Sequence, residues 1–113
     1  MSAPSPITTH VLDTAKGRPA QGIAIVLERK EGDTFAVVGQ GHTDADGRLR
    51  TLLEPGTLTA GTYRIHFDLA PYYGDAAHFF PEASIVFVVT DLAAHYHVPL
   101  LLSPFGYSTY RGS

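Results

Sequence analysis

Residues 95–102 read His95-Tyr96-His97-Val98-Pro99-Leu100-Leu101-Leu102, and this stretch decides the fold. In a β-strand successive side chains point to opposite faces of the sheet. One face of the expected strand is a core face and holds Tyr96, Val98, Leu100 and Leu102. The other face holds His95, His97, Pro99 and Leu101. Because a solvent-facing strand side usually carries Thr, Lys or Glu, we expect something to cover this second face.

Pro99 bears on the position of this strand in its sheet. Proline lacks a backbone N–H, so it favours an edge strand or a bulge over the centre of a flat sheet. We therefore expect either an edge strand or a bulge at Pro99, and an edge could pair with another subunit.

Length and composition limit the possible functions. The chain has 113 residues, and we expect one domain over residues 6–113 after a short flexible leader at residues 1–5. Its 8 Lys and Arg against 11 Asp and Glu give a net charge of −3, without a basic block. This composition argues against nucleic acid as a partner. No apolar run approaches 18 residues, so we expect no membrane association.

The absence of cysteine excludes disulfides, cysteine-based zinc sites and a thiol nucleophile. A chain without cysteine is compatible with a reducing compartment, and we expect a cytoplasmic location. The N-terminal residues show no cationic region followed by an apolar stretch, so they are not a secretory signal.

Period-2 patterns and turn residues predict about eight short strands. These strands are expected at residues 6–13, 22–29, 34–41, 49–53, 62–68, 83–90, 95–102 and 106–110. The only plausible helix is a turn or two near residues 70–77, which Pro71 and Gly74 keep short. Many short strands separated by turns indicate an all-β sandwich.

Three residues from separate elements are candidates for chemistry: His10, Arg48 and His97. An imidazole is neutral near physiological pH and can act as a base, whereas Arg offers a permanent charge and a planar fork for anions. Convergence of the three does not follow from the sequence alone. His42, His66 and His78 are interpreted as ordinary surface residues.

Other site types match the sequence poorly. His95-x-His97 has the spacing of many zinc sites, with His10 as a possible third ligand, but a convincing fourth ligand is missing, so we expect no metal. The Asp44-x-Asp46-Gly47 stretch fails as a calcium loop and is explained by a tight turn. The chain has no Gly-x-Ser-x-Gly elbow of serine hydrolases and no phosphate-binding glycine loop.

Four segments together resemble the 5-hydroxyisourate hydrolases, the transthyretin-related proteins of purine catabolism. They are residues 9–20, the turn at 43–48, the stretch 95–103, and the closing tetrapeptide Tyr110-Arg111-Gly112-Ser113. The resemblance covers nearly the whole chain after residue 5. The tetrapeptide is its most specific mark, because hormone-carrying transthyretins have a longer, different tail and lack the paired histidines.

The resemblance implies a transthyretin-like (prealbumin-like) β-sandwich of two four-stranded sheets with one short helix. It also implies a homotetramer, assembled as a dimer of dimers, with active sites in the channel between dimers. The implied catalytic residues are His10, Arg48, His97 and Ser113. The implied substrate-binding residues are Arg48, Tyr110, Arg111, Gly112 and Ser113. No cofactor is implied.

The implied reaction is hydrolysis of 5-hydroxyisourate at its N1–C6 amide bond, which gives 2-oxo-4-hydroxy-4-carboxy-5-ureidoimidazoline. One of His10 and His97 would deprotonate water, while the other would orient the water or protonate the leaving nitrogen. Two alternatives share the fold: a carrier that binds a small hydrophobic phenol in the channel, and a purely structural sandwich module. Fold alone does not separate these functions.

Overall fold

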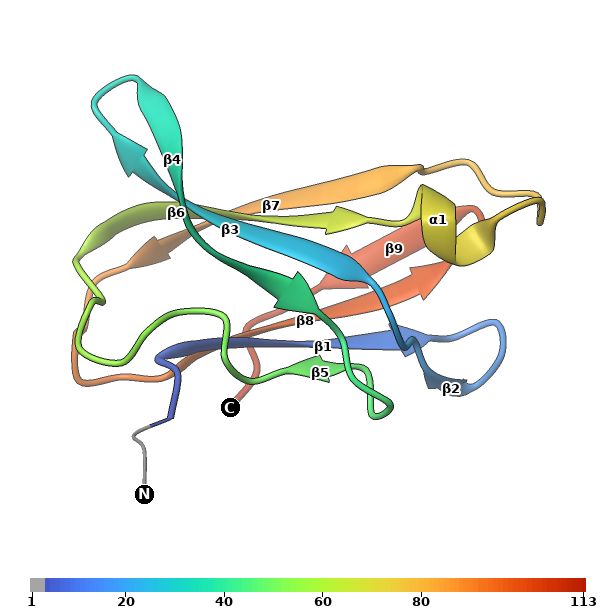
Figure 1. Cartoon of the computed structure of the whole chain (residues 1–113), viewed down its shortest axis with the longest axis horizontal. Coiled ribbons are helices and arrows are strands. Elements are labelled where there is room, and N and C mark those ends of the chain that lie inside the picture. The colour runs from blue at the N-terminus through green and yellow to red at the C-terminus, as the bar shows by residue number, and fades with distance from the viewer. Residues whose placement is uncertain (1–3) are drawn as a thin grey trace.

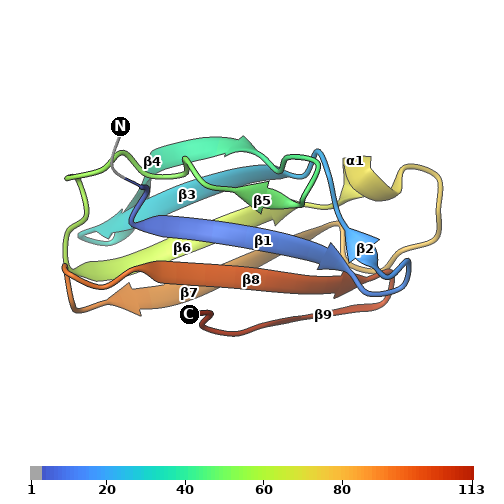
Figure 2. The same ribbon diagram turned by 90° about the horizontal axis from the view of Figure 1, so that it is seen from below.

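The computed structural model describes residues 4–113, which form a sandwich of two β-sheets (Figures 1 and 2). The first sheet contains β1 (Ile7–Asp13), β2 (Arg18–Pro19), β5 (Arg48–Leu49), β8 (Tyr96–Ser103) and β9 (Gly106–Thr109). The second contains β3 (Ala24–Glu31), β4 (Thr34–His42), β6 (Gly61–Asp68) and β7 (Glu82–Val89). The helix α1 (Ala70–Tyr73) follows β6. The predicted all-β sandwich with one short helix is confirmed.

The first sheet is built on a parallel pair of strands from opposite ends of the chain. β1 pairs with β8 over seven residues, with Ile7 opposite Tyr96 and Asp13 opposite Leu102. The strand order is β2-β1-β8-β9, and β5 adds a fifth strand by pairing with β1 beside β2. Four strands were expected here. β5 adds only two residues, because the chain then leaves this sheet toward the other one.

Alternating residues of both sheets fill the space between them. Ile7 and Val11 of β1 are fully buried against Tyr63, Ile65 and Phe67 of β6 and their neighbours in one hydrophobic core. On β8 the predicted core face is confirmed, since all four of its residues are buried: Tyr96, Val98, Leu100 and Leu102.

Of the two alternatives for Pro99, the edge strand is wrong, and an interruption in the pairing is what the structure has. β8 lies between β1 and β9. Pro99 is tolerated because its missing N–H lies where β8 makes no regular pairing with β9. The carbonyls of His97 and Pro99 both accept hydrogen bonds from the C-terminal side, from Gly112 N–H and the Thr109 hydroxyl. Regular β8–β9 pairing ends at Leu100 and Thr109, so Pro99 occupies a gap in the ladder.

Of two other predicted elements, the strand is shorter than expected and the helix has the short length expected. Of the strand predicted at residues 49–53 only Leu49 is paired, because Leu52 and Leu53 turn inward and are buried in the core. The helix predicted near 70–77 is a single turn. It ends at Gly74, whose φ of 58° is readily adopted only by glycine.

Part of the leader expected at residues 1–5 is described by the structure. Residues 1–3 of that leader lie outside the described residues. Ser5 is buried, and its hydroxyl donates to the carbonyl of Ile7 at 2.6 Å and accepts from the N–H of Leu53 at 3.0 Å. Ser5 therefore belongs to the folded domain.

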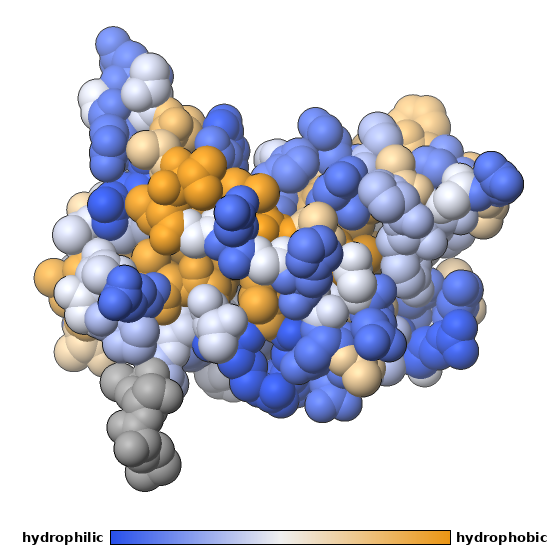
Figure 3. All heavy atoms as spheres, viewed as in Figure 1, coloured by the Kyte–Doolittle hydropathy of each residue, from blue (hydrophilic) through white to orange (hydrophobic). Residues whose placement is uncertain are grey.

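The surface carries several exposed hydrophobic side chains. Val86 and Val88 of β7 are each 59% exposed, and Phe79 and Phe105 are each 70% exposed. On the face shown in Figure 3, hydrophobic residues gather below the projecting end of the β3–β4 hairpin, while most of the remaining face is hydrophilic. Among the described residues, no helix is long and apolar enough to cross a membrane.

Candidate active site

Strand register brings the candidate residues together on the outer face of the first sheet. Thr8 lies opposite His97 in the parallel β1–β8 pair. His10, two residues further along the same face of β1, lies opposite Arg48 of β5. β8 runs beside β1 over its whole length, and the C-terminus ends next to β8 (Figure 2). His10, Arg48 and His97 therefore share one surface, as the sequence hypothesis required.

The turn before β5 holds both Arg48 and His10 in place. The Asp44 carboxylate accepts the backbone N–H groups of Asp46 at 2.8 Å and Arg48 at 3.0 Å. Gly47, with φ of 73°, closes this turn, and its carbonyl accepts the Val11 N–H of β1 at 2.7 Å. The Asp46 carbonyl lies 2.9 Å from Nε2 of His10. These contacts confirm that the Asp-rich stretch is a structural turn.

The contact with Asp46 defines the protonation of the His10 ring. A carbonyl oxygen only accepts hydrogen bonds, so Nε2 of His10 carries the hydrogen. The neutral form of His10 then has its lone pair on Nδ1. His10 is thus available as an acceptor through that nitrogen alone.

A small cavity of about 270 Å³ opens beside these residues. It is lined by Pro4, Thr8, Thr9, Arg48, Arg50, His95, His97 and Ser113. The cavity thus joins Arg48, His97 and Ser113 of the predicted catalytic set, with His10 close enough to influence the charge of His97. Arg48 and Arg50 make it a suitable place for an anionic ligand.

The Thr8 hydroxyl links two histidines. Its Oγ1 lies 2.8 Å from Nδ1 of His97 and 2.8 Å from Nε2 of His95. The His95-x-His97 spacing that suggested zinc is therefore explained by a shared hydroxyl. Among the described residues, Nε2 of His97 takes part in no hydrogen bond, so this nitrogen is available to a ligand.

Both site histidines are biased toward the neutral form. Burial lowers the pKa of His97 below its ordinary value, and the nearby charges of Arg48, His10 and His95 lower it further. Burial and the Arg48 charge likewise lower the pKa of His10. Since unfolded histidine binds its proton first as the pH falls below about 6.5, these shifts cost stability at acid pH. At neutral pH both rings are bases.

The closing tetrapeptide is divided between two faces of the sheet. Gly112 pairs with His97, and its N–H donates to the His97 carbonyl at 2.9 Å. A Cβ at position 112 would lie 2.5 Å from Cδ2 of His97, so only glycine permits this approach. Gly112 thus lets the backbone of the tail lie against the His97 ring.

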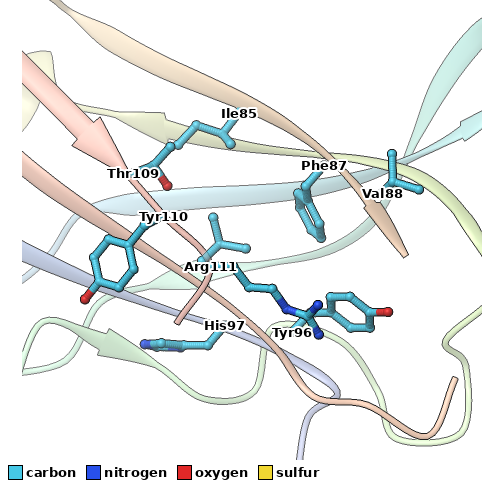
Figure 4. A pocket seen from close by; sticks show the side chains of 9 residues that line it. Ile85, Phe87, Val88, Tyr96, His97, Thr109, Tyr110 and Arg111 are labelled. Carbon is cyan, nitrogen blue, oxygen red and sulfur yellow. The ribbon is translucent and has the colours of Figure 1, made fainter. Parts of the chain in front are cut away.

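Arg111 points to the opposite side from Gly112, as alternation along an extended chain requires. Its guanidinium lies 4.5 Å from the centroid of the buried Tyr96 ring. Figure 4 shows Arg111 directed toward Tyr96 and away from the imidazole of His97. Tyr110 and Arg111 line a second, mainly apolar cavity of about 250 Å³, which also borders Phe87 of β7. The structure therefore does not bring Arg111 to Arg48.

Thr8, Arg50 and His95 belong to the site but were not selected from the sequence. The alternation in β1 placed Thr8 on the same face as His10. The parallel pairing that sets Thr8 opposite His97 could not be predicted from the sequence pattern. That pairing joins residues 89 positions apart.

Fold and site together define a transthyretin-like β-sandwich with histidines and arginines on the outer face of one sheet. The family model described as "HIUase/Transthyretin family" matches residues 7–112, and the chain belongs to this family.

Relatives of two functional kinds resemble the chain. The "5-hydroxyisourate hydrolase 2" of Rhizobium meliloti (strain 1021) is 46% identical, with both chains fully covered. The structure of Klebsiella pneumoniae 5-hydroxyisourate hydrolase superposes with a TM-score of 0.81 and 35% identity, covering 95% of this chain and 92% of that one. Sea bream transthyretin in complex with thyroxine gives a TM-score of 0.89 and 33% identity, covering 95% and 94%. The hydrolase and carrier structures thus share this fold.

The charge of Arg48 can be tested by its effect on the histidines. We expect Arg48→Gln to raise the pKa values of both His10 and His97, because a neighbouring cation that disfavours the imidazolium form is removed. NMR titration of the imidazole resonances measures both values. Arg50→Gln is the matched control, since Arg50 influences His10 weakly and is absent from the charges acting on His97. Unchanged pKa values in Arg48→Gln would show that Arg48 does not act on the rings.

Proposed function

We propose that the chain is a hydrolase that opens 5-hydroxyisourate, the oxidation product of urate. The observation that carries this proposal is the convergence of His10, Arg48 and His97 beside one small cavity. Two imidazoles biased toward the neutral form supply proton transfer, and a guanidinium supplies anion binding. Relatives named 5-hydroxyisourate hydrolase at 42–46% identity support the same substrate.

In the proposed mechanism, His97 is the general base. Its Nδ1 is held by Thr8, which leaves Nε2 to take a proton from water. His10, with Nδ1 free as an acceptor, orients the same water. The resulting hydroxide attacks the carbonyl carbon C6, and the imidazolium of His97 then returns the proton to N1 as the amide bond breaks. One water is consumed, and the ring opens to a carboxylate and an N–H group.

Arg48 has two roles in this mechanism. Its charge binds the anionic substrate, and its N–H groups stabilise the negative charge that develops on the carbonyl oxygen during attack. No metal is needed in this scheme, because a strained, activated cyclic amide responds to positioning and acid–base help. We also propose that Ser113, which lines the cavity, contacts the substrate.

The remaining tail residues have different proposed roles. Tyr110 is exposed beside His97 and is proposed to border the substrate. Gly112 allows the tail to lie against the His97 ring. Arg111 was expected to bind substrate. Its packing on Tyr96 supports an indirect role, in which it anchors the tail so that Gly112 and Ser113 reach the site.

A carrier function is the second candidate, and one observation favours it. The cavity between β7 and the C-terminal tail is lined mainly by apolar and aromatic side chains, including Phe87 and Tyr96. Such a lining suits a hydrophobic phenol. The hydrolase is preferred because a carrier has no use for the cavity that Arg48, Arg50 and His97 line, with His10 beside Arg48.

We also propose that the enzyme works as a homotetramer, a dimer of dimers. The supporting features are the open edges of β7 and β9, with Val86 and Val88 exposed on the first, and the outer face of β8, where Pro99 and Leu101 lie beyond His97. A cytoplasmic location is part of the proposal and rests on the cysteine-free sequence.

The assembly proposal predicts a mass of about four times the 12.2 kDa of one chain in sedimentation equilibrium. Dilution should reveal a dimer before a monomer, because a dimer of dimers contains two kinds of interface. A protein that sediments as a monomer at every concentration would contradict this assembly.

The catalytic proposal predicts that His97→Asn and His10→Asn each lower turnover by about 10² to 10⁴-fold, because each removes a proton-transfer group. 5-Hydroxyisourate is generated in place by urate oxidation, and its ultraviolet decay is followed with and without protein. Asn keeps a polar side chain of similar size, so circular dichroism should show unchanged folding.

His42→Asn is the control, because His42 is exposed at the end of β4 in the other sheet. It should retain full activity. Loss of activity in His42→Asn equal to that in His97→Asn would refute the site assignment. No acceleration by the unaltered protein would refute the hydrolase and favour the carrier.

A further inference from the structure

Thr8 has a contact pattern that the proposed mechanism uses only in part. Its hydroxyl lies within hydrogen-bond distance of two ring nitrogens, one from His97 and one from His95. A threonine hydroxyl carries a single hydrogen and can also accept. When it donates to one ring, the other ring must donate to it. When the Thr8 hydrogen is used in one of these bonds, the protonation of His97 is coupled to that of His95.

Two arrangements use the Thr8 hydrogen in one of these contacts; a third, in which both rings donate to Thr8, leaves that hydrogen without an acceptor among the described residues. In the first, Nδ1–H of His97 donates to Thr8, and Thr8 donates to Nε2 of His95. In the second, every hydrogen is reversed, so that Nε2–H of His95 donates to Thr8 and Thr8 donates to Nδ1 of His97. Of these two, only the first leaves a lone pair on Nε2 of neutral His97. The second arrangement places a hydrogen there, and His97 is then no base.

We propose that Thr8 and His95 are positioning residues that hold His97 in the base-competent form. This inference deepens the proposed hydrolase function and rests on it. His95 accepts the hydrogen of Thr8, which turns the oxygen lone pair toward His97. When His97 takes a proton from water, its Nδ1–H bond to Thr8 becomes charge-assisted and stronger. Thr8 and His95 thus orient the His97 ring and stabilise its imidazolium form. In catalytic triads a third residue does the same for the base.

The surroundings of the His97 ring support this role. Arg48 and His10 act on the ring through their charge, and the Gly112 backbone packs against its Cδ2 edge. The guanidinium groups of Arg48 and Arg50 are donors only, so neither arginine can accept a hydrogen from Nδ1 of His97. Among the described residues, Thr8 is the one hydrogen-bond partner of that nitrogen. Thr8 is therefore the residue through which the tautomer of His97 can be held.

The first test needs no substrate. Nitrogen-15 NMR of the imidazoles in the unaltered protein should show Nδ1 of neutral His97 protonated and Nε2 unprotonated. Thr8→Val removes the hydroxyl at nearly constant shape and should produce a mixture of both tautomers. Thr8→Ser keeps the hydroxyl and should restore the original signature. A neutral His97 that carries its hydrogen on Nε2 in the unaltered protein would overturn the proposal.

The kinetic test separates positioning from structure. Thr8→Val should lower kcat by about tenfold or more with little change in KM, since ground-state binding does not use the hydroxyl. Thr8→Ser should recover most of kcat. His95→Leu, which removes the outer acceptor, should lower kcat in the same direction. Thr62→Val, on β6 of the other sheet, is the matched control and should leave kcat unchanged.

The outcomes distinguish this inference from the proposed function. Unchanged kcat in Thr8→Val would refute the positioning role while leaving the hydrolase intact. An unaltered protein that fails to accelerate 5-hydroxyisourate decay would refute the hydrolase, and the NMR measurement would still decide whether Thr8 sets the tautomer of His97.

Discussion

The parallel pairing of β1 with β8 is the constraint on which the rest of the structure depends. It joins seven residues near one end of the chain to seven near the other, and its register decides two things at once. On the inner face it buries Ile7, Val11 and Leu100 in the core. On the outer face it sets Thr8 beside His97. A register shift of one residue would expose the core face and dismantle the site together.

The sequence predicted the inner face of this sheet better than its outer face. Alternation is a local property, so the buried residues of β8 follow directly from its apolar period. The neighbours of β8 depend on long-range pairing, which periodicity does not encode. For this reason Pro99 left an edge strand or a bulge open, and the structure places it at a gap between β9 and the Gly112 bridge.

The candidate site shows the same division. His10, Arg48 and His97 were selected by side-chain chemistry and by family resemblance, and the structure brings them together. Thr8 was passed over because a threonine in a strand has no distinctive chemistry until its cross-strand partner is known. The family resemblance implied Arg111 as a substrate-binding residue, while alternation from Gly112 directs its side chain onto Tyr96 in this structure. The fold itself does not identify the function, because a thyroxine-bound transthyretin superposes at least as well as a hydrolase.

In the proposed enzyme, small anionic ligands bind on the outer face of the β1–β8 pair and not in the apolar cavity between the sheets. The most direct measurement is an NMR titration with urate, a stable relative of the proposed substrate. His97 borders both cavities, so Arg48 and Phe87 are the deciding probes. The account predicts that urate shifts the resonances of the Arg48 guanidinium and the His10 ring and leaves Phe87 unchanged. Shifts at Phe87 with none at Arg48 would contradict it.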